Sequence, residues 1–459
     1  MTAVDRSRLP AVGSDPAFSF PEIVRHRLSN GLEVRTVEHA SVPVLTILLQ
    51  VEGGSGADAS DREGLAAIIA DMLDEGTGAL SAIDVSDAMA RIGADYDVDV
   101  SPDVMSFSLT TLVRFGTRGA SLLADMTTKP SMRETDFTRV RQMRLDRLKQ
   151  LKDLPPAVAE RAFLRLMYAQ HPYGHVPIGS DSALKRISLE DVSTLHGAMF
   201  QPSRATLVMT GALSHQEMLE IAKAAFGEWA DLAARETPVQ RASAIEPSEM
   251  APPRLAIVPR EAAAQSELRI GHLSARRNTP DYPALLVMNA LLGGQFVSRI
   301  NLKLREEKAY TYGARTGFDW RRGLSPFVLQ ASVHTVSTAD AIADAIAEIE
   351  GLRDSRPPTP DELVLAKASL TRGYPRNFET AQQVARSVAQ LALYDLPDSY
   401  FADFVPKVNA ITQDDVTRVA TQYLVPEKMS TLIVGDHSAI ADSLHTLGLG
   451  TPSVLPLEV

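Results

Sequence analysis

Two segments of the chain share one pattern at a constant spacing. Ile187–Gly211 (ISLEDVSTLHGAMFQPSRATLVMTG) and Ile411–Gly435 (ITQDDVTRVATQYLVPEKMSTLIVG) align over 25 positions without a gap, and their final glycines are 224 residues apart. Each copy reads as an acidic helix start, a helix, a proline-marked turn and a β-branched strand that ends in glycine. Because a whole helix–turn–strand unit recurs without a gap, we predict two copies of one fold.

The chain length agrees with a division into two domains. A chain of 459 residues is too long for one compact core. Between the two copies, residues 236–254 contain four prolines and no apolar period, which is typical of a surface linker. We predict a tail at residues 1–20, a first domain at 21–235, a linker at 236–254 and a second domain at 255–459.

Strand patterns occur in pairs and helix patterns in runs, which favours an α+β fold over a doubly wound sheet. A hairpin is predicted around Asn30-Gly31, where a two-residue turn separates two strand-like segments. We expect each domain to hold a mostly antiparallel sheet with helices packed on one face. The other predicted strands are 42–51, 105–113, 255–258, 267–272, 310–319 and 327–333, and the predicted helices are 63–73, 135–152, 156–170, 282–292, 339–352, 359–372 and 380–394.

Composition excludes several classes of function. The chain has no cysteine, so disulfides, thiolate metal sites, iron–sulfur clusters and a cysteine nucleophile are excluded. With 46 basic and 57 acidic residues its net charge is −11, a sign that repels nucleic acid. The longest mostly apolar run, 42–51, is half of what crosses a bilayer, so no membrane partner is expected. The first twenty residues lack a continuous apolar stretch, which predicts a cytoplasmic location, or a periplasmic one if a signal peptide has been removed.

The residues of the first domain show no catalytic constellation by themselves. His171 and His175 are the closest pair of histidines, but the proline and glycine in HPYGH do not support a helix with both rings on one face. A structural loop is the better interpretation. The glycine-rich stretch VEGGSGAD lacks the dinucleotide fingerprint, which disfavours a phosphate site.

One helix concentrates basic residues in this acidic protein. Residues 138–152, TRVRQMRLDRLKQLK, place Val140, Met143, Leu148 and Leu151 at near-helical spacing, so these side chains are predicted to form an apolar stripe. The basic face is interpreted as a solvated surface, with contact to an acidic partner or substrate as the alternative.

The stretch after the predicted strand 42–51 resembles the zinc-binding region of the pitrilysin/insulinase metallopeptidase family. The family pattern G-L-A-H-x-x-E-H-M-L-x-x-G-T aligns without a gap with Gly64–Thr77. The two metal histidines then fall on Ala67 and Asp71, and the catalytic glutamate falls on Ala70. The motif needs two imidazoles one helical turn apart and a carboxylate as general base, and this chain has neither.

The resemblance places the family's third metal ligand, a glutamate on a later helix, near Asp146–Leu148. Arg147 would oppose a dication there, and Asp146 alone could not hold one. We therefore predict no metal and no cofactor in this chain.

A second family landmark lies in the second domain. The segment LLGGQFVSRINLKLREEKAYTYGA, Leu291–Ala314, resembles the family stretch that carries an arginine and a tyrosine, which fall on Arg305 and Tyr312. In the family this pair contacts the peptide and the oxyanion formed in hydrolysis. A guanidinium can grip a carbonyl and a phenol can donate to an alkoxide. Tyr310 competes for the tyrosine role, because Ala309 and Tyr310 depart from the family's local pattern.

Some bacterial members of the family divide these parts between two chains, and the resemblance implies that this chain is the metal-free one. The family fold implies a half-clamshell that closes a chamber with a homologous, zinc-bearing partner, to which Arg305 and Tyr312 are supplied in trans for peptide hydrolysis. Alone, the chain is expected to be inactive, so its status as an enzyme depends on the partner. The alternatives are a silent peptide-binding or assembly scaffold, like the core subunits of respiratory complexes with this fold, and a homodimer that only binds peptide.

Overall fold

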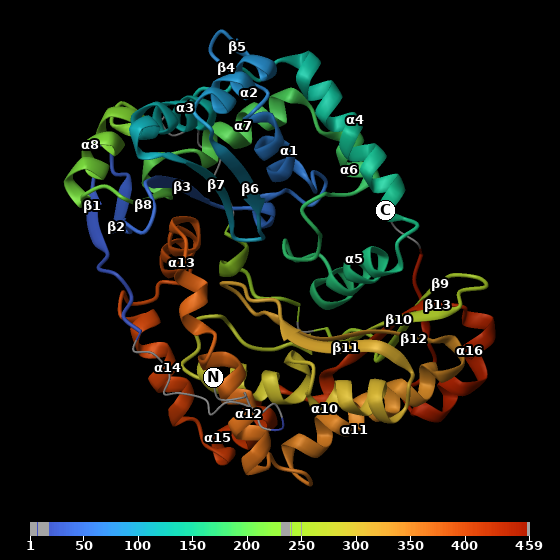
Figure 1. Cartoon of the computed structure of the whole chain (residues 1–459). Coiled ribbons are helices and arrows are strands. Elements are labelled where there is room, and N and C mark those ends of the chain that lie inside the picture. The colour runs from blue at the N-terminus through green and yellow to red at the C-terminus, as the bar shows by residue number, and fades with distance from the viewer. Residues whose placement is uncertain (1–6, 8–17, 231–238, 240, 249, 457–459) are drawn as a thin grey trace.

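The molecule consists of two halves, each built on a six-stranded sheet, as Figure 1 shows. The structure, a computed structural model, describes residues 7, 18–230, 239, 241–248 and 250–456. The strands of the first sheet, in spatial order, are β1 (Val24–Arg27), β2 (Glu33–Glu38), β8 (Ala205–Gly211), β3 (Val44–Glu52), β7 (Val104–Leu112) and β6 (Asp95–Val100). Those of the second are β14 (Ser453–Val454), β9 (Leu255–Pro259), β13 (Ser430–Gly435), β10 (Gln265–Leu273), β12 (Pro326–His334) and β11 (Thr311–Phe318).

The two sheets have the same internal order, which confirms the predicted α+β fold of two similar domains. The strands that end the sequence repeat, β8 and β13, occupy the same place. Each runs parallel to one neighbour, β2 or β9, and antiparallel to the other, β3 or β10. The sheets differ at the outermost strand, because β1 is antiparallel to β2 whereas β14 is parallel to β9.

Most helices of each half cover the outer face of its own sheet. The first half contains α1 (Leu65–Met72), α2 (Ala82–Arg91), α3 (Gly116–Thr128), α4 (Glu134–Leu151), α5 (Pro155–Tyr168), α6 (Asp181–Arg186), α7 (Leu189–Met199) and α8 (His215–Phe226), with a two-stranded sheet of β4 (Gly76–Thr77) and β5 (Leu80–Ser81). The second half contains α9 (Tyr282–Asn289), α10 (Arg299–Asn301), α11 (Thr338–Arg353), α12 (Pro360–Thr371), α13 (Ala381–Leu393), α14 (Tyr400–Ala410), α15 (Gln413–Tyr423) and α16 (His437–Leu444). Two wider π-helical turns, η5 (Ala290–Gly294) and η6 (Leu302–Glu307), follow α9 and α10.

Each sheet also receives one helix from the opposite half on its inner face. Helix α13 packs on β3 and β8 of the first sheet, and α5 packs on β10 and β13 of the second. Val388 of α13 belongs to a core cluster with Leu48, and Phe163 of α5 to one with Leu432. Both helices lie between the sheets in Figure 1. The halves therefore share buried apolar surface, which is the main favourable term in folding.

Local sequence signals account for several elements. Gly31 has a φ of 91° in the predicted hairpin, where Arg27 pairs with Glu33 across the turn. Both copies of the repeat begin with a capping box, Ser188 with Asp191 and Thr412 with Asp415. The side chain of the first residue accepts a bond from the backbone of the third helical residue, which satisfies an otherwise free N–H.

The predicted tail and linker lie partly outside the described residues, and the domain boundaries stay a prediction. Residues 18–20 of the tail are placed on the second half, where the Phe18 ring stacks on Phe378 with centroids 5.0 Å apart. In the linker, 236–238, 240 and 249 are outside the described residues. The described part contains a short turn, Ala242–Ala244, whose Ala242 is buried in the cluster that contains Tyr173.

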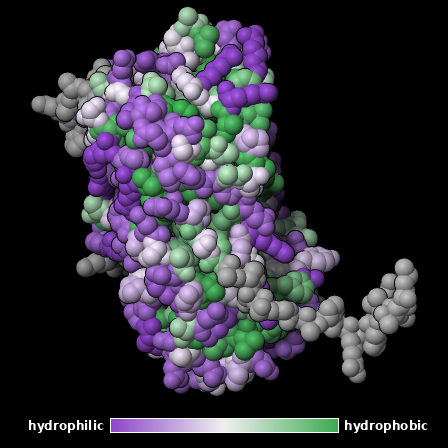
Figure 2. Space-filling view, turned by 60° about the vertical axis from the view of Figure 1, so that its left-hand side comes forward, coloured by the Kyte–Doolittle hydropathy of each residue, from purple (hydrophilic) through white to green (hydrophobic). Residues whose placement is uncertain are grey.

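The helical segments between Tyr282 and Glu307, interrupted by a turn at 295–298, together have the length and mean apolar composition that a membrane span requires. Just over half of the most apolar window is buried inside the protein, and apolar side chains such as Leu285 and Leu292 belong to the core of the second half. A core helix of a soluble protein meets the same criteria. On the face drawn in Figure 2, hydrophilic and apolar side chains are interspersed.

Candidate functional site

Helix α1 carries the positions that align with the zinc motif, and Ala67 and Ala70 are buried on it. The helix follows Gly64, whose φ of 98° is readily adopted only by glycine. Its first free backbone N–H groups are accepted by Asp58, whose Oδ2 lies 2.7 Å from the Gly64 nitrogen and whose Oδ1 lies 2.8 Å from that of Ala66. The carboxylate therefore stabilises the helix start.

His175, from the HPYGH loop, completes this arrangement. Its Nε2 lies 3.1 Å from Oδ2 of Asp58, and both side chains are buried. The other histidine, His171, contacts the backbone oxygen of Ile245 at 3.0 Å. The two histidines thus have separate partners, which supports the interpretation of HPYGH as a structural loop.

Arg144 of α4 binds the face of α1 on which the metal ligands would lie. Its Nε donates to Oδ2 of Asp71 at 2.7 Å, and its Nη2 donates to the backbone oxygen of Ala67 at 2.9 Å. A fixed guanidinium therefore stands beside both of the positions that align with the metal histidines. Methyl groups at 67 and 70 offer no ligand atoms, and the remaining carboxylate is paired, so these residues do not fit a zinc ion.

The residues predicted to stand near the third ligand position make no hydrogen bond or ion pair to α1 among the contacts that the structure describes. Asp146 pairs with Lys149 at 2.8 Å, Arg147 donates to Gln150 at 3.0 Å, and Leu148 is buried in the core of the first half. Arg144, one helical turn earlier, makes the contact instead. Sequence alignment could not distinguish these positions, because helical residues three or four apart share a face.

The basic helix uses its arginines within the first half. Arg139 forms an ion pair with Glu75, and Arg141 donates to the backbone oxygen of Ile187 at 3.0 Å. Of the predicted apolar stripe, Val140 and Leu148 are buried, but Met143 is 60% exposed. The apolar stripe of α4 is therefore only partly buried.

Across the residues that the structure describes, no three His, Asp, Glu or Cys side chains are grouped so that they could hold a metal ion.

A second feature near the motif is Asp74, whose pKa is raised to about 6 by burial and by the charge of Glu75. Like-charged neighbours and burial both disfavour the ionised carboxylate.

Arg305 lies on η6 in the second half, over an exposed aromatic ring. Its guanidinium carbon is 4.5 Å from the centroid of Phe296, and its Nε is 3.2 Å from Oε1 of Glu306. Phe296 is 59% exposed, although large aromatic side chains are usually buried. The ring therefore supports the guanidinium, and the Arg305 side chain remains 37% exposed.

Tyr312, on the edge strand β11 of the second sheet, and Tyr310, just before that strand, have different environments. Tyr312 is 86% exposed, at a register shift between Thr311 and Ala314. Tyr310 packs against the core, and its backbone oxygen accepts from the His334 N–H at 3.0 Å. Tyr312 therefore presents its phenol to solvent, whereas the ring of Tyr310 is partly packed on the core.

Asn301 joins the segments that carry Phe296 and Tyr312, and sequence analysis missed it. Its buried side chain donates to the backbone oxygen of Phe296 at 2.7 Å and accepts from the N–H of Ala314 at 3.1 Å. One amide thus bridges the loop and the edge strand just past the register shift. An unpaired backbone group at either end would be costly.

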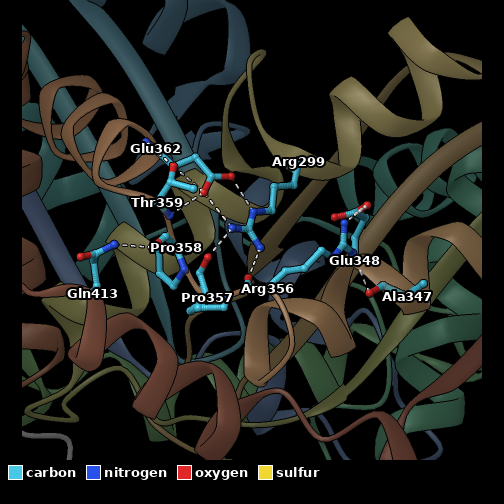
Figure 3. Close-up of polar contacts among 9 residues, drawn as sticks. All are labelled: Arg299, Ala347, Glu348, Arg356, Pro357, Pro358, Thr359, Glu362 and Gln413. Carbon is cyan, nitrogen blue, oxygen red and sulfur yellow. Dashed lines mark hydrogen bonds and ion pairs between the residues drawn. The ribbon is translucent and has the colours of Figure 1, made fainter.

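A network of charged groups holds Arg299 of α10, the short helix that leads into η6, and Figure 3 shows its contacts. Arg299 donates two hydrogen bonds to Glu362, at 2.6 and 2.7 Å, and further bonds to the backbone oxygens of Arg356 and Pro357. Glu362 also accepts from the Thr359 N–H at 2.8 Å, which caps α12. Burial opposes ionisation of Glu362, but these bonds outweigh it and lower its pKa to about 2.

The fold and the site define a class: a two-half protein of metallopeptidase type whose own metal positions are occupied by alanine and a salt bridge. Family models agree. Residues 34–179 match the model described as insulinase, peptidase family M16, and residues 186–370 match the peptidase M16 inactive domain. The chain belongs to this insulinase-type family and lacks its zinc motif.

Relatives and solved structures match over nearly the whole chain. An uncharacterized zinc protease of Mycobacterium tuberculosis is 21% identical over 90% of this chain and 93% of its own, and the zinc protease PqqE of Helicobacter pylori is 22% identical over 89% and 91%. The crystal structure of a peptidase M16 inactive domain from Pseudomonas fluorescens has a TM-score of 0.83 at 22% identity, covering 90% of this chain and 98% of that one. The structural match supports the predicted fold.

Proposed function

We propose that this chain is the metal-free subunit of a heterodimeric zinc peptidase, and that Arg305 and Tyr312 act in the active site of a homologous, zinc-bearing partner. The observation that carries the proposal is the exposure of Tyr312 on the edge strand β11, two residues after Tyr310, whose ring is partly buried against the core. Exposure of the Tyr312 phenol to solvent adds no buried apolar surface, so it does not contribute to the stability of the sheet.

The support around Arg305 is of the same kind. The side chain is held over Phe296, its helical segment is anchored through Arg299, and Asn301 fixes the neighbouring strand. Groups that act on a transition state must be held in position before the substrate arrives, because reorganisation would cost part of their effect. A guanidinium can hold a peptide carbonyl and a phenol can donate to the tetrahedral oxyanion.

The metal and the general base would come from the partner. Arg144 beside Asp71, with methyl groups at Ala67 and Ala70, leaves this chain without the groups that activate water. The family relatives named as zinc proteases support a peptidase as the assembly, and the inactive-domain match is consistent with pairing to an active subunit.

Co-expression with a homologous chain that carries an intact H-x-x-E-H motif tests the proposal. We expect peptide cleavage by the mixture to exceed that of the partner alone, and to fall about 100-fold in kcat with Arg305→Ala, the loss typical of one transition-state donor. Zinc-dependent cleavage by this chain alone, abolished by a chelator, would contradict it. A silent scaffold predicts instead that Arg305→Ala and Tyr312→Phe leave the partner's activity unchanged.

A further inference from the structure

Beside the apolar contact with α13, the inner face of the first sheet carries polar side chains on β6 and β7. Across β3, β7 and β6, two rows of residues stand in register: Leu48, Ser108 and Asp97 in one row, and Gln50, Ser106 and Asp99 in the next. Side chains of a strand alternate between its two faces. The edge strand β6, with the sequence DYDVDV, therefore directs its aspartates to one face.

A cavity of 490 Å³ lies between these rows and α13. Asp97, Asp99 and Ser108 line it from the sheet, Arg386 lines it from α13, and Trp320 lines it from the loop after β11. Its volume is within the range of small-molecule sites. With Asp103, its lining contains three carboxylates and one guanidinium, so the net charge favours a cation.

The polar groups of the cavity are incompletely partnered. The Ser108 hydroxyl is buried and has no hydrogen-bond partner among the described residues, which is unusual for a buried polar atom. Arg386 forms its ion pair with Asp97, at 2.8 Å. Burial and the charge of Asp97 raise the pKa of Asp99, with Arg386 opposing the shift. A cationic ligand would therefore improve the environment of both Ser108 and Asp99.

We propose that this cavity binds a protonated amine or guanidinium on an aliphatic stem, with the Asp99 carboxylate as counter-ion and the Ser108 hydroxyl as acceptor. The Trp320 ring adds an aromatic surface to which cations and their stems bind favourably. The cation can belong to a lysine or arginine side chain of a peptide or to a free alkylamine. The site belongs to this chain alone, so its binding does not depend on a zinc-bearing partner.

Trp320 provides the measurement, because the chain has only two tryptophans and the other, Trp229, packs against the outer core of the first half. In Trp229→Phe protein, we expect the fluorescence of Trp320 to change on titration with agmatine and with a short peptide that contains one arginine. The same peptide with citrulline, which is isosteric but uncharged, should bind at least about tenfold more weakly. Binding of the peptide alone would show that the cation belongs to a peptide. Equal binding of agmatine would show that the site recognises the cation alone. Either result supports the proposal.

Substitutions then locate the site. Asp99→Asn should weaken binding about tenfold and Ser108→Ala about threefold, whereas Asp95→Asn, on the same strand but outside the cavity lining, should leave binding unchanged. If Trp229→Phe unfolds the protein, calorimetric titration of the unmodified chain replaces fluorescence. Equal binding of the arginine and citrulline peptides, equal effects of Asp99→Asn and Asp95→Asn, or no binding of either ligand would overturn the proposal.

Discussion

Arg144 and Asp71 form the ion pair that joins α4 to α1, with Nε 2.7 Å from Oδ2. The same guanidinium donates to the backbone oxygen of Ala67. In relatives with the full motif, two ligands on one helix and one on a later helix would be joined by a metal. Here a side-chain cation occupies the face of α1 where that metal would bind, so the contact between the helices no longer depends on metal loading.

Removal of either partner of this pair should destabilise the first half without changing any response to metal. We expect about 0.5–1 kcal/mol for Asp71→Ala, whose side chain is 44% exposed, and about 1–2 kcal/mol for Arg144→Ala, which also loses the bond to Ala67. Urea unfolding measures both. Asp146→Ala, on the same helix, is the control and should cause no measurable change, and a midpoint lowered by a chelator would contradict this account.

Tyr312 and Tyr310 should differ in their effects on the assembled peptidase. Because Tyr312 is exposed and Tyr310 packs on the core, Tyr312→Phe should lower kcat of the heterodimer 10- to 100-fold at unchanged stability. Tyr310→Ala should lower the melting temperature of this chain. The opposite assignment, loss of kcat with Tyr310→Phe and none with Tyr312→Phe, would show that Tyr310 is the functional residue.

Phe296 and Asn301 should act on catalysis by positioning Arg305 and Tyr312. Asn301→Ala removes one bond to the Phe296 loop and one to Ala314 of β11, so we expect a loss in kcat and a destabilisation of about 1–3 kcal/mol. Phe296→Ala should lower kcat with little effect on stability, because the ring is exposed. Phe296→Tyr retains the ring face and should restore kcat; failure of that rescue would argue against a positioning role.

Glu362 should make stability depend on acid pH. Its pKa is lowered to about 2 in the folded chain from an ordinary 4.5, so its contribution is complete above pH 4.5 and is lost as the pH falls towards 2. We expect about 1–2 kcal/mol, reduced by solvent because the side chain is 30% exposed. Glu362→Gln retains the cap of α12 and should flatten the pH dependence of urea unfolding between pH 2 and 5. Equal slopes for the two proteins would contradict this.

The two halves should not fold separately. Each sheet has one face covered by a helix from the other half, α13 on the first sheet and α5 on the second. Expressed alone, residues 18–230 and 250–456 would expose that apolar surface, so we expect aggregation or a dye-binding, loosely packed state. Co-expression should give a soluble complex with one cooperative unfolding transition. Two stable, independent halves would show that the shared helices contribute little.

Local signals in the sequence predicted most of the helices and strands, but not which of their side chains other elements bury. The turn at Asn30-Gly31 and the capping boxes at Ser188 and Thr412 depend on neighbours within a few residues, so they could be read from the chain. The burial of the stripe on α4 could not, because helical periodicity identifies a face but not what packs on it, and Met143 of this stripe is 60% exposed. The same limit hid Asn301, since its two partners lie on separate segments.

By itself, the sequence determined what chemistry this protein lacks. Alanine at 67 and 70 cannot bind a metal or accept a proton in any fold, and the 224-residue repeat required two copies of one unit. Only the tertiary structure decided which groups face one another. Arg144 pairs with Asp71, and α5 and α13 each pack on the sheet of the opposite half. Tyr312 is exposed to solvent, whereas Tyr310 packs on the core. Side-chain chemistry belongs to one residue, whereas burial and pairing depend on elements that are far apart in the sequence and meet only when the chain folds.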